Sequence, residues 1–445
     1  MKTADSRQWR TSAAILALIV AAGCGTSATT SPSGLASDAG SNPSGAEAPD
    51  GQLQFAIFGG GGAHLDAILA EVDAFAAAHA GISVDVTQDS FYSRPVPYAK
   101  LQERYFEATP DLVSGFIGGS LTADAEAGRF LDLTDLWAEL GLEEAVPASV
   151  AELASVDGHR YWVPTIAQWN PVFYNTEAFA AADITPPRTW DELLAACGSL
   201  RAAGSERPIG QAGTASWTPP AARWFSTLDL LLNGPEFHRR LARGEVAWTD
   251  ERVTTVFEHW QQLFDEGCYG EPALQAYSDP ISQLSDGRAA MDNLGEWIFE
   301  SALLSDDDPI DFFSLEPIGE GLPRSEIVLV YGLAIPAAAA DPEGAKELLR
   351  WLVSSAAQER TYASVPRVIL DSRVDPGYLQ RHRDGLQLFE DADRLVELWE
   401  FSAPSPQAEI GLELFTSYLA DQSGLDGYLQ TAETARADAF GPPTE

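Results

Sequence analysis

The chain has 445 residues and a formal net charge of −39, because 66 Asp and Glu residues outnumber 27 Lys and Arg residues. This excess of negative charge argues against nucleic acid as a partner, since a phosphate backbone would be repelled. Three cysteines are too few for a disulfide framework, and a hydrophobic fraction of 45% is too high for a disordered chain. The length exceeds that of a typical single core, so we expect two domains or lobes.

The N-terminal segment is organised like a secretory signal. Residues 1–10 carry three basic side chains, and the uncharged, mostly apolar stretch 11–22 is too short to span a membrane. Small residues then precede Cys24, a pattern that resembles the bacterial lipobox although Ala21 replaces the usual Leu. The pattern predicts a signal peptide over 1–23 and lipidation of the cysteine that follows. The alternative is an ordinary signal peptide with a chance cysteine.

Residues 24–50 consist mainly of Ser, Thr, Gly, Ala and Pro and contain almost no large apolar side chain. Such a segment cannot bury a core, so we predict a flexible tether between Cys24 and the folded part of the chain. No later stretch of the sequence approaches the roughly 20 apolar residues of a membrane span.

Strand and helix patterns alternate after the tether. A β-like run at 52–58 is followed by a helical apolar stripe over 65–75, and an alternating strand pattern follows at 82–86. This β-α-β order predicts a parallel sheet with helices on its faces, and hence an α/β fold class. Further strand candidates lie at 111–117 and 172–174.

Three later helices are predicted, two of them by explicit start signals. Thr189 and Glu192 form a predicted capping box in front of an apolar stripe. The pattern over 250–266 is that of an amphipathic helix. Asp341 and Pro342 place an N-cap residue and a first-turn proline where another helix should begin.

The sequence lacks the motifs that most catalytic chemistries need. None of the six histidines stands in a metal-ligand spacing, and neither a phosphate-binding loop nor a G-x-S-x-G turn occurs. The run Gly59–Gly62 fails the dinucleotide fingerprint, because His64 stands where its third glycine should be. We therefore expect no catalysis, no metal and no cofactor. Carboxylate pairs that hydrolyse glycosides leave no local motif, so an extracellular carbohydrate-active enzyme stays open as an alternative.

A series of short segments occurs in one order between residues 52 and 440. The segments are Pro110–Val113, Gly118-Gly119, Leu131–Thr134, Asp157–Pro164, Tyr174-Asn175, Pro186–Leu193, Gly287–Met291 and Gly295-x-Trp297. Together, behind the lipobox and tether, they resemble the family 1 extracellular solute-binding proteins, the sugar receptors of ABC importers. Within that family the likeness is to maltose- and glucose-type receptors.

The resemblance implies a periplasmic-binding-protein-like fold of two α/β lobes, joined by several hinge crossings, with the ligand in the cleft between them. This agrees with the β-α-β pattern and with the length. Transferred to this chain, the first lobe comprises 51–167 and 331–376, and the second comprises 168–330 and 377–445. We expect the chain to cross between the lobes at these boundaries.

The resemblance also implies a function. We expect a monomeric receptor outside the cytoplasm, held at the cell membrane only through lipidated Cys24. It would capture a mono- or oligosaccharide and deliver it to the transmembrane subunits of an ABC permease. A receptor for a non-sugar solute is a variant of this function, and the carbohydrate-active enzyme is the alternative from another class.

Candidate ligand residues follow from sugar chemistry together with the resemblance. A sugar presents C–H faces to aromatic rings and hydroxyl groups to polar side chains. The ligand-binding candidates are Trp297, Trp169, Gln168, Tyr331, Trp217, Trp224, Ser114, Phe116 and His64. Trp297 is the expected stacking residue. The alternative is a core position for each of the aromatic candidates and a surface position for His64.

The resemblance places Cys197 and Cys268 in the second lobe, on or after neighbouring helices. An oxidising compartment would permit a disulfide between them. The alternative for Cys197 is a buried thiol on the apolar stripe of its helix.

Overall fold

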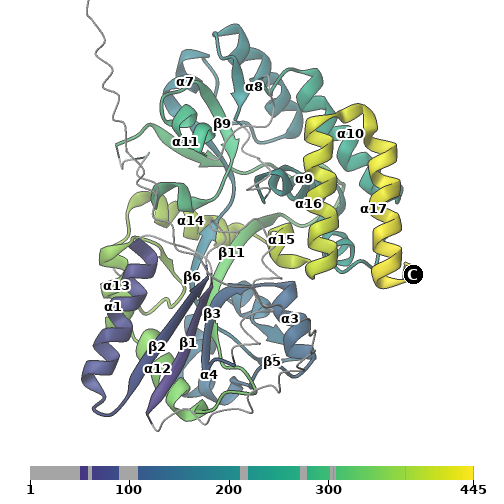
Figure 1. The fold of residues 1–445 in the computed structure, drawn as a ribbon. Coiled ribbons are helices and arrows are strands. Elements are labelled where there is room, and N and C mark those ends of the chain that lie inside the picture. Colours follow the sequence, from purple (N-terminus) through teal and green to yellow (C-terminus); the bar gives the residue numbers. More distant parts are fainter. Residues whose placement is uncertain are drawn as a thin grey trace, which may run out of the picture. The chain divides into compact units, whose positions relative to one another are not determined.

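The computed structural model describes residues 51–58, 63–89, 109–210, 219–270, 278–300, 304, 307–375 and 377–443 (Figure 1). The predictions on the signal peptide, the tether and Cys24, on Gly59–Gly62 and on Trp217 lie outside these ranges. Among the helices within the ranges, none combines the length and the apolar character that crossing a membrane requires.

Seven strands form the sheet of the first lobe. They are β1 (Gln52–Phe58), β2 (Ser83–Asp89), β3 (Leu112–Ile117), β6 (Val163–Trp169), β11 (Ser325–Ala334), β12 (Val368–Ile369) and β13 (Arg394–Glu397). The order is β12-β6-β11-β3-β1-β2, with β13 also paired to β11. β1, β2 and β3 are parallel, as the β-α-β pattern predicts, but β11 is antiparallel to both β3 and β6. The sheet is therefore mixed, which corrects the expectation of a parallel sheet: β11 returns from the second lobe and enters against the direction of β3.

The second lobe contains a sheet of four strands. They are β7 (Val172–Asn175), β8 (Arg207–Ile209), β9 (Ala289–Asn293) and β10 (Ile310–Phe313). The order is β10-β7-β9-β8, and only β8 and β9 are parallel. A separate ribbon pairs β4 (Ser155–Val156) with β5 (His159–Arg160).

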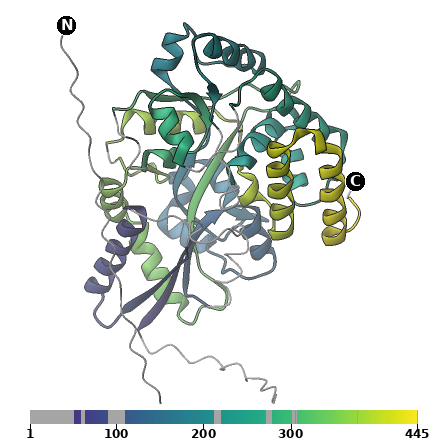
Figure 2. The same ribbon diagram turned by 45° about the horizontal axis from the view of Figure 1, so that its top comes forward.

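Helices surround both sheets (Figures 1 and 2). Those with the first sheet are α1 (Ala63–Ala78), α3 (Gly119–Glu126), α4 (Thr134–Leu140), α5 (Leu142–Ala145), α6 (Ala148–Leu153), α12 (Pro342–Leu352), α13 (Ser355–Ser364) and α14 (Gln380–Asp391). Those with the second are α7 (Thr176–Ala181), α8 (Trp190–Ala202), α9 (Pro219–Ala242), α10 (Glu251–Asp265), α11 (Ser278–Ser285), α16 (Ser405–Ala420) and α17 (Leu425–Phe440). The short helices are η2 (Glu296–Glu300), α15 (Trp399–Ser402) and η3 (Gln422–Gly424). In Figure 1, α1 lies beside α13 at one flank of the first sheet, and α16 and α17 form a hairpin.

The helix start signals read from the sequence are confirmed. Thr189 Oγ1 accepts a hydrogen bond from Glu192 N at 3.2 Å, and the Glu192 carboxylate accepts one from Thr189 N at 3.2 Å. Asp341 caps α12 through its own carboxylate. The amphipathic helix expected over 250–266 is α10, and the structure adds that Asp250 is its capping residue. These side chains satisfy backbone N–H groups that have no partner inside the helix.

A disulfide joins Cys197 on α8 to Cys268, which follows α10, with the two Cα atoms 5.2 Å apart. Cys197 is therefore part of a disulfide and not the buried free thiol that was the alternative. Ile209 N donates to Cys268 O at 2.9 Å, so the segment after α10 also lies against β8. The disulfide and this hydrogen bond together hold α8 and α10 to the edge of the second sheet.

The chain passes between the two sheets three times. β6 of the first sheet is followed by β7 of the second, β10 of the second is followed by β11 of the first, and β13 of the first is followed by α15 and α16. The second passage therefore ends before β11 begins at Ser325, and the third begins only after β13 ends at Glu397. The boundaries expected near 330 and 376 differ from this, because α14 and β13 still pack with the first sheet.

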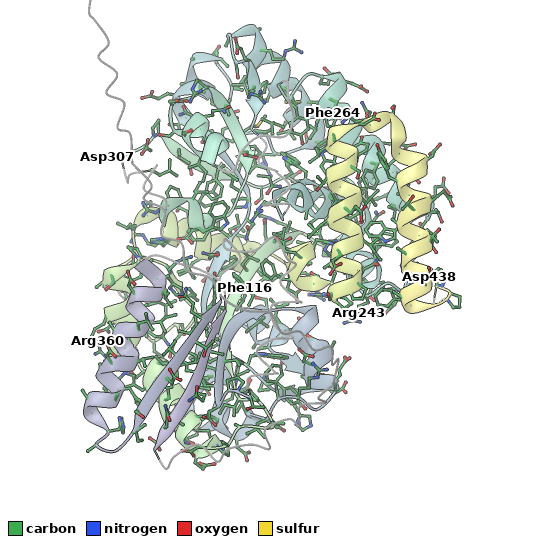
Figure 3. All side chains as sticks on the ribbon, in the orientation of Figure 1. Phe116, Arg243, Phe264, Asp307, Arg360 and Asp438 are labelled. Carbon is green, nitrogen blue, oxygen red and sulfur yellow. A yellow bond between two sulfur atoms is a disulfide. The ribbon has the colours of Figure 1, made fainter. Side chains whose placement is uncertain are left out.

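The short helix α15 is anchored in both lobes by neighbouring side chains. The ring of Trp399 lies 5.2 Å from Trp248 and 5.6 Å from Phe415, in the core of the second lobe. Phe401 instead lies 4.4 Å from Phe116 at the end of β3. Figure 3 labels Phe116 at the middle of the molecule, where the strands of the first sheet end. Glu400, between the two anchors, is thereby held at the junction of the lobes.

A close approach of α15 explains the Gly118-Gly119 pair that contributed to the resemblance. A Cβ atom at Gly118 would collide with the carbonyl oxygen of Phe401, and one at Gly119 with the carbonyl oxygen of Ser402. Because both colliding atoms belong to backbone, no side-chain rotation would relieve the collisions. These glycines therefore let α15 dock on the start of α3.

We expect Gly118→Ala to lower the free energy of unfolding by about 1–3 kcal/mol, because the added methyl group must displace α15. Gly198→Ala is the matched control, since its added Cβ on α8 meets no atom within 4 Å. The control should raise stability by roughly 0.5–1 kcal/mol through its higher helix propensity. Urea unfolding of both variants decides, and equal effects would contradict the close approach.

Candidate functional site

A group of buried polar side chains lies where the two lobes meet. It consists of Arg223 on α9, Asp292 and Asn293 on β9, Trp297 on η2 and Glu400 on α15, and we call it the junction site. The four polar residues are each at most 3% exposed, whereas Trp297 is half-buried. Burying this many polar groups costs free energy unless they are hydrogen-bonded. Packing alone therefore does not explain why these polar residues are buried here.

The elements that carry the junction site are tied to one another. Asn293 Nδ2 donates to Thr227 Oγ1 at 2.8 Å, which fixes the end of β9 against α9. Arg223 lies one turn before Thr227 on the same helix. The guanidinium carbon of Arg223 is 5.6 Å from the centre of the Trp297 ring, within the range of a cation–π interaction. The arginine thus supports one face of that ring.

The carboxylates of the junction site are strongly affected by burial. Burial raises the pKa of Asp292 well above its ordinary value, although the positive charge of Arg223 acts in the opposite direction. Burial also raises the pKa of Glu400 to about 7, again against the charge of Arg223. The arginine therefore compensates the desolvation of both groups only in part.

Three oxygen atoms of the junction site accept no hydrogen bond within the described part of the chain. Asp292 Oδ2, Asn293 Oδ1 and Glu400 Oε2 are buried and accept no hydrogen bond from any residue that the structure describes. Each such buried group costs about 1–3 kcal/mol. A ligand that brings hydroxyl or N–H groups would remove this cost. No set of three or more His, Cys, Asp or Glu side chains in the described ranges is arranged to hold a metal ion.

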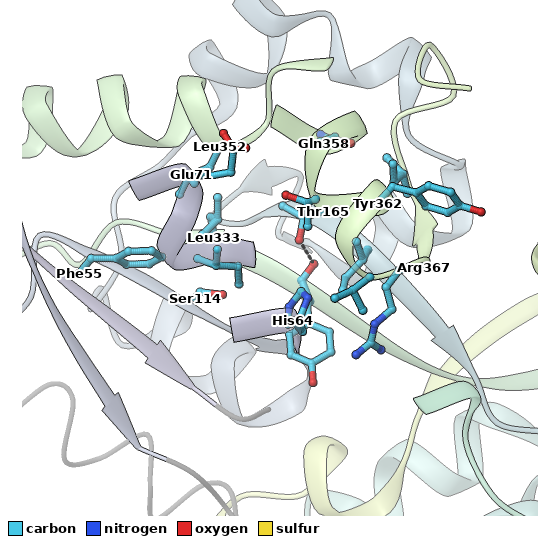
Figure 4. A pocket seen from close by; sticks show the side chains of 16 residues that line it. Phe55, His64, Glu71, Ser114, Thr165, Leu333, Leu352, Gln358, Tyr362 and Arg367 are labelled. Carbon is cyan, nitrogen blue, oxygen red and sulfur yellow. Dashed lines mark hydrogen bonds between the residues drawn. The ribbon is translucent and has the colours of Figure 1, made fainter. Parts of the chain in front are cut away.

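A hollow lies in the first lobe, and we call it the lobe-1 pocket (Figure 4). Its empty volume is about 620 Å³, and its walls come from α1, α12, α13 and the strands β1, β3, β6, β11 and β12. The predicted ligand residues His64, Ser114 and Tyr331 line it, together with Arg367. The sequence alone gave no indication that these residues share one cavity.

The side chain of His64 lines this pocket and is uncharged. Burial, together with the positive charge of Arg367, lowers the pKa of His64 to about 3. The imidazole is therefore neutral at physiological pH. Its Nδ1 atom is buried and bonds to no residue in the described part of the chain, and its ring centre lies 5.5 Å from that of Tyr331. A side chain only 7% exposed is not the surface histidine of the alternative interpretation.

The lobe-1 pocket adjoins the junction site along two lines of contact. The ring of Tyr331 is 4.0 Å from that of Phe116, which in turn packs on Phe401 beside Glu400. Arg367 Nη1 lies 3.5 Å from a carboxylate oxygen of Glu296, the residue before Trp297. The pocket residue Tyr331 is therefore linked through Phe116 to the neighbour of Glu400, and the pocket residue Arg367 contacts the neighbour of Trp297.

The family of the chain follows from comparison with known proteins. Residues 61–359 match the model of the bacterial extracellular solute-binding proteins. The chain belongs to this family. It is 28% identical over 305 residues to an uncharacterized ABC transporter extracellular-binding protein of Pyrococcus horikoshii, a match that covers 66% of each chain. The match thus spans just under two thirds of that relative's length.

Solved structures show the same fold for this solute-binding protein. The bacterial solute receptor AcbH superposes with a TM-score of 0.73 at 21% identity, over 88% of this chain and 100% of that chain. A chitin oligosaccharide binding protein gives a TM-score of 0.73 at 21% identity, over 87% of this chain and 98% of that chain. The two-lobed α/β architecture expected from the sequence is therefore confirmed.

Three predicted ligand residues of the solute-binding protein are core residues. Trp169 is fully buried against Gly385 of α14, with its ring 5.9 Å from His382. Trp224 is fully buried in the core of the second lobe. Gln168 is 2% exposed within the β6–β11 pairing. None of the three lines the lobe-1 pocket. The structure corrects the expectation for the two tryptophans, because helices and strands from distant parts of the chain cover their rings, whereas a ligand contact of Gln168 stays a prediction.

The other predicted ligand residues within the described ranges lie in or between the junction site and the lobe-1 pocket. Trp297 belongs to the junction site and keeps exposed surface, while His64, Ser114 and Tyr331 line the lobe-1 pocket. Phe116 is 3% exposed and connects the two sites by packing between Tyr331 and Phe401.

Sequence reasoning missed the charged members of the junction site. Asp292 directly follows the segment Gly287–Met291 that carried the resemblance. That segment draws attention to this part of the chain but does not indicate that Asp292 is a buried carboxylate. Arg223 and Glu400 belong to common charged residue types and stand in no motif. Only the packing of α9 against α15 brings these two residues to β9.

The raised pKa of Glu400 predicts a pH dependence of stability. Between pH 4.5, the ordinary pKa, and about 7, the folded protein keeps a proton that the unfolded chain has released. Stability should therefore fall as pH rises through this window. Glu400→Gln removes this contribution, which is on the order of 1–3 kcal/mol, so the variant should lose less stability between pH 5 and 7.

Urea unfolding at several pH values measures this effect. Burial raises the pKa of Glu326 to about 7 as well, so part of the decline persists in the variant. Glu320→Gln, at an exposed position, is the control and should keep the full decline. Parallel pH profiles for the Glu400→Gln variant and the unchanged protein would contradict the assignment.

Proposed function

We propose that this protein is the substrate-binding component of an ABC importer, and that it captures a mono- or oligosaccharide between its lobes for delivery to a membrane permease. The observation that carries the choice of a sugar is the junction site. Its three buried oxygens without donors match sugar hydroxyls, and the half-buried ring of Trp297 matches a C–H face of a sugar ring. Membership of the solute-binding family supports the transport role.

The relatives support the same class of ligand. AcbH is described as having an exclusive preference for β-D-galactopyranose, and another structural neighbour binds chitin oligosaccharides. We propose that the ligand draws the lobes together around the junction site, with the three chain passages as hinges. The apparent affinity then includes the cost of reaching the closed form.

A second candidate function is hydrolysis of a glycoside. Two buried carboxylates, Asp292 and Glu400, lie around Arg223, and burial raises the pKa of both. One of them could hold the proton that a general acid needs. Binding with the ligand recovered unchanged supports the receptor, whereas release of a cleaved sugar supports the enzyme.

A thermal-shift screen followed by calorimetry tests the receptor function. The panel comprises galactose, glucose, maltose and chitobiose, and each is recovered and weighed by mass spectrometry after incubation. At least one should raise the melting temperature, since a ligand that binds only the folded state stabilises it. The expected result is one intact sugar bound per chain. If no sugar shifts the melting temperature, the proposed ligand class is wrong.

Trp297→Ala should weaken binding of the sugar about 10- to 100-fold, because a stacking face worth ~1.5–3 kcal/mol is lost. Its melting temperature should change little, since the ring supports the core only in part. Trp224→Ala is the contrasting variant: its ring is fully buried, so it should cost ~3–5 kcal/mol of stability. Unchanged affinity of the Trp297→Ala variant, together with a large drop in melting temperature, would make Trp297 a core residue.

We also propose that the chain is cleaved before Cys24 and that this cysteine carries the lipid anchor of a monomeric protein outside the cytoplasm. The lipobox-like sequence and the tether behind it support this. Cys24→Ser should release the protein from the membrane fraction or leave it unprocessed. Mass spectrometry of the mature N-terminus checks the proposal, and a different first residue without lipid would refute it.

A further inference from the structure

Much of the lining of the lobe-1 pocket is apolar. The apolar lining residues are Phe55, Ile68, Ile166, Leu333, Leu352, Val365 and Ile369. A sugar hydroxyl placed among these side chains would lose its hydrogen bonds to water without replacement. A sugar alone therefore leaves the apolar part of this lining unused.

The two charged residues that line this pocket, Glu71 and Arg367, each have an oppositely charged partner within the protein, Arg360 and Glu296 respectively. Glu71 is 5% exposed, and its carboxylate accepts two hydrogen bonds of 2.7 Å from Arg360 and one of 3.2 Å from Trp351 Nε1. The negative charge is thus already compensated by α13. A neutral group can occupy the pocket without leaving a buried charge unpaired.

One polar atom in the wall is without a donor. Gln358 is 7% exposed, and its Nε2 atom donates to Val353 O at 2.9 Å, which fixes the amide. Its Oε1 atom is buried and accepts no hydrogen bond from the described residues. In Figure 4, Gln358 lies on the opposite side of the pocket from His64. A group that extends across the pocket from His64 would reach this acceptor with its distal end.

The pocket and the junction site adjoin through side-chain contacts of Tyr331 and Arg367. Tyr331 connects through Phe116 to α15, and Arg367 lies beside Glu296 on η2. We propose that the ligand is a glycoside whose sugar binds the junction site and whose apolar, ring-sized aglycone enters the lobe-1 pocket. This inference rests on the proposed function for the sugar half. The unused Oε1 of Gln358 favours an aglycone that ends in a hydroxyl group.

Calorimetry with paired glycosides tests the inference. The probes are the methyl, phenyl and 4-hydroxyphenyl β-D-glucopyranosides and the corresponding galactopyranosides. Phenyl glycosides should bind at least about tenfold more tightly than methyl glycosides, because the ring leaves water for an apolar pocket. The 4-hydroxyphenyl glycosides should bind at least as tightly as the phenyl ones. Equal affinities of the methyl and phenyl compounds would overturn the inference while leaving the sugar receptor intact.

Variants of α13 locate the effect. Thr361 lines the pocket and is half-buried, so Thr361→Phe fills the space and should abolish the advantage of phenyl over methyl. Ala363→Phe, at an exposed position of the same helix, is the matched control and should keep the advantage. Ile68→Phe fills the pocket from α1 and replaces the first variant if that one does not fold. A phenyl advantage that persists in both pocket-filling variants would place the ring elsewhere.

A probe without sugar separates the two proposals. 4-Fluorophenol is titrated into the protein and followed by fluorine NMR, with Thr361→Phe and Ala363→Phe as before. Saturable binding of the phenol that only the pocket-filling variant removes, while no glycoside binds, would refute the sugar and with it the glycoside, and would leave the pocket as a site for an aromatic ligand. Failure of both the phenol and every glycoside would overturn both proposals.

Discussion

The arrangement of the lobes depends on α15, a helix of four residues whose neighbouring side chains are buried in different cores. Trp399 is anchored among the aromatic rings of the second lobe, and Phe401 packs on Phe116 of the first. Because aromatic rings bury large areas, each anchor resists withdrawal. Glu400 lies between these two residues, so it can move away from the junction only if Trp399 or Phe401 leaves its packed position. Gly118 permits the close backbone approach that this double anchoring requires.

Burial of charge follows from that constraint. Once Glu400 is held between the lobes, the positive charge of Arg223 on α9 acts on it and on Asp292 of β9, and both carboxylates are desolvated. Two carboxylates and one arginine leave acceptor capacity unused, which is unfavourable in the unliganded protein. Ligand hydroxyl groups would restore the missing hydrogen bonds. The same groups that lower the stability of the unliganded form can thereby favour the form that holds the ligand.

The two sites differ in chemistry although they adjoin. The junction site is polar and gathers residues from α9, β9, η2 and α15, whereas the lobe-1 pocket is mainly apolar and lies within one lobe. Tyr331 and Arg367 stand at the boundary between them. A ligand with one polar and one apolar part would satisfy both, and the order of these parts along the ligand would then select its orientation in the cleft.

Local signals in the sequence determined much of this protein: the capping residues, the β-α-β start of the first lobe and the ordered segments that indicated its family and two-lobed fold. Such features depend on neighbours a few residues away. The role of each tryptophan was decided only by tertiary structure, because Trp169 is covered by α14 and Trp297 is left half-exposed by elements remote in the chain. The junction site was likewise decided in three dimensions: Arg223 and Glu400 stand in no motif, and only the packing of α9 and α15 removes them from water together.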